Sequence, residues 1–417
     1  MDHVKLAELS AWITETGLAG QSETEMMGEF CARATAAGLP IAEGVVVVDT
    51  LHPQYEGHAI RWGRDKEEKV VRTEYGRTTE GGPAAEAYRR SPYYHLLQSG
   101  EPMLRRRLTP EGDGEFELLA TARRDGMTDY VALLARFAAE GVIGDMDCIY
   151  SSWATDRPEG FSDADVAALS RLFPYLAIAM KCAALGRTAR ALAETYLGRG
   201  AAEMVLGGRI ARGVAEKIDA VLWFSDLRGY TKITDTAAPD QIIPLLNDYA
   251  EAVVSAVQGE GGDVLKLIGD GVLAIFRAGA RVEACSAAIQ AALTAKRGIH
   301  ELNRRRESAG LPTTHMYLGL HVGEVFFGNI GSKDRLDFTV VGPAVNEVSR
   351  IAAMCRSADQ PLLVSAGFAE ALGQAGPPLA SVGRFALRGV GRAQELFTLD
   401  PDWVAAARAR KLEARQA

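Results

Sequence analysis

The chain has 417 residues, with 46 lysines and arginines against 54 aspartates and glutamates, and a formal net charge of −8. This length predicts two domains and a connector, and the negative charge without a basic stripe argues against nucleic acid as a partner. Five widely spaced cysteines with no C-x-x-C pair argue against a disulfide framework and a zinc site and fit a cytoplasmic protein, and no membrane span is expected because no stretch approaches about 20 apolar residues.

The first region, residues 1–160, is predicted to be an α+β domain. A helical pattern covers Glu23–Ala37, helix-like stretches occupy 83–99, and runs rich in β-branched and apolar residues predict strands at 44–49, 61–63, 128–133 and 145–152. The stretch Tyr130–Trp153, followed by Phe161–Asp165, resembles the carboxyl half of a GAF domain. A PAS-like domain and an unrelated α+β fold stay open. In each case the region would serve as a regulatory domain for an unidentified small-molecule or ionic effector.

The second region, residues 161–212, is predicted to be a helix followed by a connector. Apolar residues recur at helical spacing from Asp163 to Gly200, and Ser162 or Asp163 can cap the start of the helix. The pattern fits a single amphipathic helix lying on the first domain, and it fits equally well a parallel dimer helix that carries a signal. The helix is expected to break within Tyr196–Gly200, and further glycines mark the connector at positions 207, 208 and 213.

A carboxylate follows the first strand of the third region. Residues 218–223 form an apolar run typical of a buried strand, Asp226 comes at its end, and Arg228–Thr231 supplies a tight turn. A carboxylate beside the free N–H groups of a turn suits a divalent cation that carries a phosphate. Taken alone, a strand-end aspartate is more often a cap or turn residue.

A second carboxylate lies in a predicted hairpin. Strands at 264–268 and 272–276 flank a turn that contains Asp270, and a helical pattern at 239–258 separates this hairpin from the strand before Asp226. A strand, helix and hairpin in this order bring both aspartates to one edge of the sheet. Lys266 stands between apolar residues, which predicts a central strand in which the lysine needs a polar partner.

A third motif runs from a strand into a helix. The strand covers 337–342 and contains Thr339, and Pro343 is placed as a first-turn residue of the helix. Asn346 and Arg350 are four residues apart and therefore share one helix face. His321, between Leu320 and Val322, fits a packed strand histidine better than a catalytic one, and a haem or metal ligand among His52, His58 and His95 is the less favoured interpretation of those residues.

Together these motifs resemble the class III nucleotidyl cyclases, over roughly residues 210–400. Phe224–Thr231 is similar to the family's first metal motif, Lys266–Asp270 to the stretch with the purine-reading lysine and second metal aspartate, and Phe338–Gly342 to the strand that completes purine selection. The resemblance implies a ferredoxin-like α+β catalytic domain at 213–400, followed by a tail at 401–417.

The resemblance also implies roles for individual residues. Two Mg²⁺ or Mn²⁺ ions per site would be held by Asp226, Leu227 and Asp270, and the catalytic pair would be Asn346 and Arg350. The substrate would be bound by Lys266, Thr339, Arg388, Gly229, Tyr230 and Thr231. Arg388 falls where the family usually has a lysine, which keeps the charge but changes the geometry.

The implied activity is adenylyl cyclisation, in which ATP is converted into 3′,5′-cyclic AMP and pyrophosphate. Thr339 is similar to the subclass that includes soluble, bicarbonate-responsive adenylyl cyclases. Family geometry places the metal aspartates on one subunit and Lys266, Asn346 and Arg350 on the other, so a homodimer is expected. A guanylyl cyclase, which would call for an acidic residue near position 266, and a silent nucleotide-binding module are the alternatives.

Overall fold

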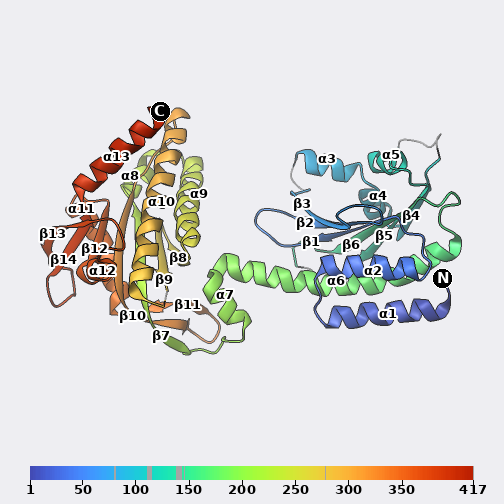
Figure 1. The fold of residues 1–417 in the computed structure, drawn as a ribbon, viewed down its shortest axis with the longest axis horizontal. Helices are drawn as coiled ribbons and strands as arrows, with labels where there is room; N and C mark the ends of the chain where they lie inside the picture. Colours follow the sequence, from blue (N-terminus) through green and yellow to red (C-terminus); the bar gives the residue numbers. More distant parts are fainter. Residues whose placement is uncertain (79–80, 110–114, 138–142, 145, 278, 417) are drawn as a thin grey trace. The chain divides into compact units, whose positions relative to one another are not determined.

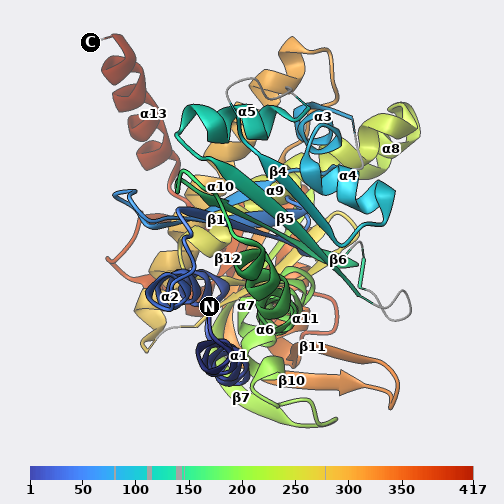
Figure 2. The same ribbon diagram turned by 90° about the vertical axis from the view of Figure 1, so that its right-hand side faces the viewer.

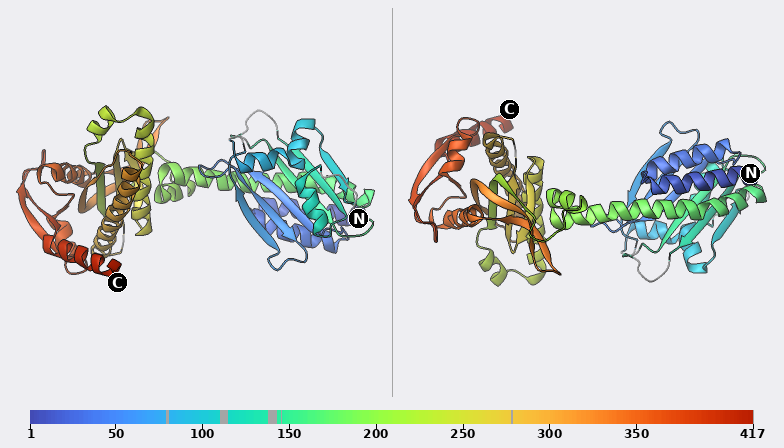
Figure 3. Two further views of the ribbon diagram at one scale, coloured as in Figure 1. Left: turned by 90° about the horizontal axis from the view of Figure 1, so that it is seen from above. Right: turned by 90° about the horizontal axis from the view of Figure 1, so that it is seen from below.

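The computed structural model describes residues 1–78, 81–109, 115–137, 143–144, 146–277 and 279–416. It contains two compact units, Met1–Leu192 (unit 1) and Ala193–Ala417 (unit 2), which are drawn in Figures 1, 2 and 3. Each unit is described by itself. The division falls inside the stretch that was predicted as helix and connector.

Unit 1 is an antiparallel sheet with helices on both faces (Figure 1). The strand order is β3-β2-β1-β6-β5-β4. The strands are β1 (Glu43–Asp49), β2 (Gly57–Gly63), β3 (Val70–Tyr75), β4 (Met103–Arg107), β5 (Asp129–Arg136) and β6 (Cys148–Thr155). One face packs against α1 (His3–Leu18), α2 (Glu23–Ala36) and α6 (Asp163–Leu197), and the other against α3 (Pro83–Arg89), α4 (Pro92–Ser99) and α5 (Glu117–Arg124).

Most of the predicted elements of the first region are present. The helix at 23–37 and the strands at 44–49, 61–63 and 128–133 are confirmed, and the fourth strand begins at Cys148, while Asp145 lies outside the described residues. The elements α1, β3, β4 and α5 were not predicted. Strand β3 is largely exposed and β4 carries three arginines, so neither shows the apolar alternation by which a strand is recognised.

Helix α6 is a 35-residue helix whose apolar residues Leu169, Leu172, Leu176 and Met180 are buried in the core of unit 1. Ile178, which belongs to the same series of apolar residues at helical spacing, is 63% exposed. By length and composition alone, α6 is the one candidate membrane span among the described residues. The mean hydropathy is 1.3 for an 18-residue window of this helix, and half of that window is buried in the protein, as in a core helix. The predicted helix break is confirmed at Gly198, whose φ is +82°.

Unit 2 is built on a larger mixed sheet in the order β13-β14-β12-β10-β7-β9-β8, with β11 paired to β10. Its strands are β7 (Ala215–Leu227), β8 (Asp263–Ile268), β9 (Gly271–Phe276), β10 (Met316–Gly331), β11 (Leu336–Val341), β12 (Leu362–Ser365), β13 (Leu379–Phe385) and β14 (Gln394–Leu399). The segment β7-α9-β8-β9-α10-β10 has the spatial order β10-β7-β9-β8, with antiparallel neighbours. This is the expected ferredoxin-like arrangement.

The helices of unit 2 cover both faces of this sheet. They are α7 (Arg199–Leu206), α8 (Tyr230–Thr236), α9 (Pro239–Gly259), α10 (Arg281–Ser308), α11 (Pro343–Ser357), α12 (Ala366–Leu372) and α13 (Pro401–Gln416), the last of which occupies the predicted tail. Val221 and Trp223 of β7 pack with α9 and α10, whereas Ala220 and Leu222 pack with α7 and α11. Strand β7 is therefore buried on both faces and paired on both edges, so its end is firmly positioned.

Candidate active site

The carboxylates of Asp226 and Asp270 meet at the end of β7. The backbone N–H of Leu227 donates to Asp226 Oδ1 at 3.0 Å and lies 3.4 Å from Asp270 Oδ2. Strand β9, which starts just after Asp270, pairs directly with β7. The strand, helix and hairpin therefore bring both aspartates to one sheet edge, as the sequence predicts.

The electrostatics of this pair fit a divalent cation. Burial, together with the hydrogen bond and negative charge of Asp270, raises the pKa of Asp226 to about 6. Two carboxylates this close repel each other when both are ionised, and a cation between them would relieve the repulsion. Carboxylate oxygens are also the ligands that Mg²⁺ and Mn²⁺ prefer, so the side chains present suit the implied metals.

Buried side chains form hydrogen bonds that hold the end of β7 in place. Tyr249 Oη donates to Ser225 Oγ at 3.1 Å and Trp223 Nε1 donates to the same oxygen at 3.0 Å. Ser225 is fully buried, so these two bonds hold the residue next to Asp226 in place. The sequence analysis did not single out this support, although Tyr249 at a helical position facing the strand was a signal for it.

The turn after Asp226 has the predicted conformation. Gly229 has φ of +74° and precedes α8, which begins at Tyr230. A left-handed conformation of this kind favours glycine because a Cβ would be strained. Gly229, Tyr230 and Thr231 thus lie three to five residues after Asp226, and within the described residues no side chain caps the start of α8.

Lys266 is placed differently from the prediction. Strand β8 ends the sheet order, so Lys266 is on a terminal strand and its side chain is 42% exposed. Of the two apolar neighbours that indicated a central strand, Leu265 is buried, whereas Leu267 is 56% exposed. Its partner is Asp337, with which it forms an ion pair and a hydrogen bond.

Asp337 was missed by sequence reasoning, although it is two residues from Thr339 on β11. Residues two apart in a strand point to the same face, and Phe338 between them is buried on the other side. Lys266, Asp337 and Thr339 therefore form one group. Its acidic member is the feature that the pattern of residue types did not predict.

Asn346 and Arg350 lie on α11, Asn346 exposed and Arg350 partly so. Arg350 lies against the loop that carries Arg388, because a Cβ on Gly389 would be 3.4 Å from Arg350 Nη1. Arg388 itself is exposed. Within the described residues, no hydrogen bond or ion pair joins Asp226 or Asp270 to these groups on α11 and β8. The residues predicted for the site thus fall into two sets. The aspartate group is Asp226 and Asp270, and the second group lies on β8, β11, α11 and the Arg388 loop, for which the sequence analysis predicts purine and phosphate binding.

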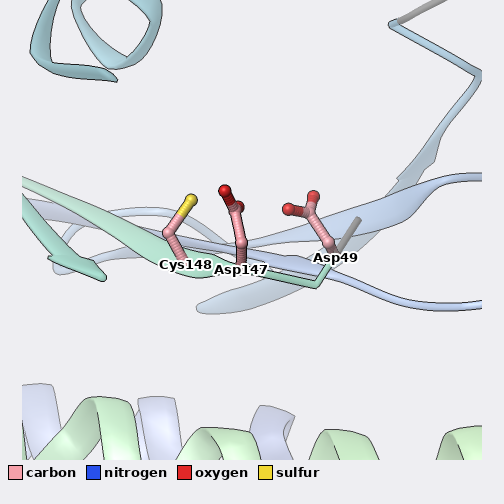
Figure 4. A group of neighbouring side chains, drawn as sticks. All are labelled: Asp49, Asp147 and Cys148. Carbon is pink, nitrogen blue, oxygen red and sulfur yellow. The ribbon is translucent and has the colours of Figure 1, made fainter. Parts of the chain in front are cut away.

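A further group of potential metal ligands lies in unit 1 (Figure 4). Asp49, Asp147 and Cys148 each offer one ligand atom, these atoms lie within 4.8 Å of one another, and all three side chains point to the same side of the sheet. Burial raises the pKa of the Cys148 thiol. Among the described residues this is the one such group of three, and it contains no histidine.

Comparison with known proteins gives the family of unit 2. Residues 214–400 match the family model of the adenylate and guanylate cyclase catalytic domain. These residues form a domain of that family. The match lies within unit 2 and does not extend to unit 1.

The chain is also similar to individual proteins. An adenylate cyclase from Anabaena cylindrica is 34% identical over 143 residues, which are 33% of this chain and 28% of that protein. Adenylate cyclase 1 from Rhizobium meliloti is 27% identical over 160 residues, 38% of this chain and 24% of that protein. The crystal structure of the adenylyl cyclase CyaB from P. aeruginosa aligns with 45% of this chain and 96% of its own, at 21% identity and a TM-score of 0.42. The matched segments thus span about a quarter of the two curated relatives.

Proposed function

We propose that this chain is an adenylyl cyclase that converts ATP into 3′,5′-cyclic AMP and pyrophosphate. The observation that carries the proposal is the Asp226 and Asp270 pair around the Leu227 N–H, at the end of the central strand of a cyclase-family domain. When bound there, two Mg²⁺ or Mn²⁺ ions would lower the pKa of the ribose 3′-hydroxyl and neutralise the triphosphate.

The residues of the chain would supply positioning and charge. Asn346 would orient the ribose, and Arg350 would stabilise the charge that develops on the α-phosphate. Arg388 lies in the loop against which Arg350 packs and would bind the phosphates of the same nucleotide. Lys266 and Thr339 would hold the purine through its ring nitrogen and its exocyclic edge.

We further propose that the complete site forms between two copies of the chain. The aspartate group and the group on β8, β11 and α11 form no hydrogen bond or ion pair with each other in the described part of the chain. Leu267 and Ile268, next to Lys266, are 56% and 47% exposed, which fits an apolar contact surface beside the purine group. A homodimer with a two-fold axis would hold two such sites.

A guanylyl cyclase is the second candidate, and one observation favours it. Asp337 forms an ion pair with Lys266, so an acidic group does lie near position 266. A carboxylate there could accept hydrogen bonds from the ring N–H and amino group of guanine, whereas Lys266 donates to an adenine nitrogen. The choice of purine therefore depends on which of the two side chains faces the base.

One experiment separates these proposals. The purified chain is incubated with ATP or GTP and with Mg²⁺ or Mn²⁺, and the cyclic product is identified by mass spectrometry. We expect cyclic AMP from ATP. Cyclic GMP formed from GTP as the main product would make the chain a guanylyl cyclase, and nucleotide binding without any cyclic product would make unit 2 a silent nucleotide-binding module.

Unit 1 is proposed to regulate this activity. A six-stranded antiparallel sheet with helices on both faces is compatible with the GAF-like regulatory domain expected at 1–160, and the free cysteines support a reducing, cytoplasmic setting. Deletion of 1–160 should change the rate and leave the choice of nucleotide unchanged. Bicarbonate is the first effector to assay, because Thr339 is similar to the bicarbonate-responsive subclass.

A further inference from the structure

Helix α11, which carries Asn346 and Arg350, sits unusually close to strand β10. Gly319, His321 and Gly323 are spaced by two residues, so they share the face of β10 under the helix. A Cβ on Gly319 would lie 2.7 Å from Val348 O and from Ala352 N, and one on Gly323 would lie 2.8 Å from the Cβ of Ala344. The helix therefore rests almost directly on the strand backbone, and His321 is the side chain between the two glycines.

His321 connects the helix to the sheet. Its Nδ1 lies 2.9 Å from Ser365 Oγ at the end of β12, and its Nε2 lies 3.6 Å from Glu347 Oε2 on α11. The side chains of His321 and Glu347 are only 13% and 22% exposed. Burial lowers the pKa of His321, although the charge of Glu347 opposes this shift, so a neutral imidazole is the form that occupies this position.

Glu347 has a second partner on another strand. Gln394 Nε2, at the start of β14, donates to Glu347 Oε2 at 2.7 Å. The same carboxylate oxygen thus faces β10 through His321 and accepts a hydrogen bond from β14. A helix that is held by apolar contacts alone can rotate slightly about its axis, whereas the directional hydrogen bond from Gln394, with His321 packed 3.6 Å from the same carboxylate oxygen, restricts that rotation.

The position of Glu347 in the sequence gives these contacts a functional consequence. It follows Asn346 directly and precedes Arg350 by three residues, so any rotation of α11 at Glu347 moves both residues. Gln394 ends the connection from β13 to β14 that carries Arg388. Arg350 also lies against this connection at Gly389. Glu347 therefore links the helix with Asn346 and Arg350 to the loop with Arg388.

We propose that Glu347 is a positioning residue for catalysis. Held by the hydrogen bond from Gln394 and packed beside His321, it sets the rotation of α11 and the placement of α11 against the Arg388 loop, so that Asn346, Arg350 and Arg388 reach one nucleotide together. This inference rests on the proposed cyclase function. His321, which the sequence analysis interpreted as a packed strand histidine, does pack in the strand and in addition supports Glu347.

The test separates catalysis from binding and from folding. Because the purine and metal groups stay intact, Glu347→Ala should lower kcat about 10- to 100-fold while KM for ATP changes less than about threefold. Glu347→Gln keeps an acceptor for Gln394 and should restore kcat to within about threefold of wild type. The thermal unfolding midpoint of each full-length variant shows whether the fold persists.

The matched control is Glu395→Ala on the same strand as Gln394. Glu395 accepts a side-chain hydrogen bond of the same length, 2.7 Å from Ser381 Oγ, but on the exposed side of β14. This variant should leave kcat unchanged. Gln394→Ala serves as a second route to the same bond if Glu347→Ala does not fold, and the double variant should be no slower than Glu347→Ala alone, because both changes remove one interaction.

The outcomes distinguish a failure of the positioning role from a failure of the proposed cyclase function. An active wild-type chain whose kcat is unchanged by Glu347→Ala and by Gln394→Ala would overturn the positioning role and leave the cyclase proposal standing. Equal losses of kcat in Glu347→Gln and Glu347→Ala, or a loss that follows unfolding, would also overturn it. A wild-type chain that forms no cyclic product from any nucleoside triphosphate would overturn the proposed function and this inference together.

Discussion

The ionised form of Asp226 lowers the stability of unit 2, and in the proposed site a cation would relieve this cost. It is half-buried and next to Asp270, and both surroundings favour its neutral form. Below about pH 4, Asp226 is protonated in the folded and unfolded chain alike. Between its ordinary value of 3.8 and the raised pKa of about 6, the folded chain keeps a proton that the unfolded chain has lost, so stability falls as the pH rises through this window.

The first prediction follows from this fall in stability with rising pH. In the absence of metal, Asp226→Asn should stabilise the chain at pH 8 and should give no gain at pH 4. The full pKa difference corresponds to about 3 kcal/mol, which solvent screening at a half-exposed site reduces to about 1 kcal/mol. The same variant should lose cyclase activity. Chemical denaturation in a chelator at both pH values measures the effect.

Asp219→Asn is the control for this prediction. Asp219 is on the same strand but is paired with Arg281 at 2.6 Å in an exposed ion pair. Its replacement should change stability by less than about 0.5 kcal/mol at either pH. A destabilised Asp226→Asn variant at pH 8 would mean that the neighbouring carboxylates are not in repulsive contact.

The second prediction concerns Lys266. Lys266→Glu places a carboxylate beside Asp337 and in front of the purine, so kcat/KM for ATP should fall at least about 100-fold, while the metal concentration for half-maximal rate stays the same. Lys217→Glu is the matched control, because Lys217 is also an exposed lysine in an ion pair, 2.8 Å from Glu324. A loss of similar size in both variants would remove the purine role from Lys266.

At the scale of elements, polar interactions of Arg187 and Thr188 hold α6 against the rest of unit 1. Arg187 of α6 forms an ion pair with Glu23 of α2, and its Nη2 lies 3.4 Å from Nδ1 of His58 on β2. Burial alone would raise the pKa of Glu23, but the nearby His58, whose Nε2 lies 3.6 Å from Glu23 Oε1, and the hydrogen bonds from Arg187 outweigh it and lower that pKa. Next along the helix, Thr188 Oγ1 is 2.8 Å from Thr50 Oγ1.

The third prediction tests the ion pair between Arg187 and Glu23. Arg187→Ala leaves the carboxylate of Glu23, which is 7% exposed, without its cationic partner, so the free energy of unfolding of unit 1 should fall by about 3 kcal/mol. Calorimetry of the full chain measures the loss. Arg190→Ala, on an exposed position of the same helix, should change stability by less than about 0.5 kcal/mol.

A further variant shows whether the ion pair itself is responsible. Glu23→Met combined with Arg187→Met replaces the pair with apolar side chains, and stability should recover most of the loss. If the Arg187→Ala variant and the Arg190→Ala control have the same unfolding temperature, α6 is held by its apolar residues alone.

At the scale of the whole molecule, the two groups of site residues bear on assembly. Asp226 and Asp270 lie at the end of β7, and Lys266 with Asp337 lies between β8 and β11, without a polar contact between the groups in the described part of the chain. In the proposed homodimer, a second copy would supply the missing half of a site that is divided in this way. Activity should therefore depend on which lesions share a subunit.

The fourth prediction uses this dependence. Asp226→Ala and Asn346→Ala should each be nearly inactive alone, because each homodimer has the same lesion in both sites. In a mixed dimer both lesions fall in one site and the other site is intact. With random pairing half of the dimers are mixed, so roughly a quarter of wild-type activity should return. If subunit exchange is confirmed and activity does not return, the aspartates and Asn346 of one chain serve the same site, and the proposal of a site shared between two chains is wrong.

The sequence by itself determined the local part of this protein. The strand before Asp226, the hairpin at Asp270, the helix that carries Asn346 and Arg350, and the break at Gly198 all follow from periodicity and turn residues within a short window. Motif order over residues 210–400 was enough to indicate the cyclase family. Elements with polar or exposed strands, such as β3 and β4, escaped the same method because they lack that periodicity.

Only the tertiary structure decided which side chains became partners. Lys266 and Asp337 are 71 residues apart, and whether β8 is central or terminal depends on how all the strands of the sheet are ordered. Glu347 meets His321 and Gln394 because α11 rests on the glycines of β10, a contact that leaves no local pattern in the sequence. Burial and pairing across the chain are set by packing, so residues that hold the site in place could be recognised only once the strands and helices were assembled.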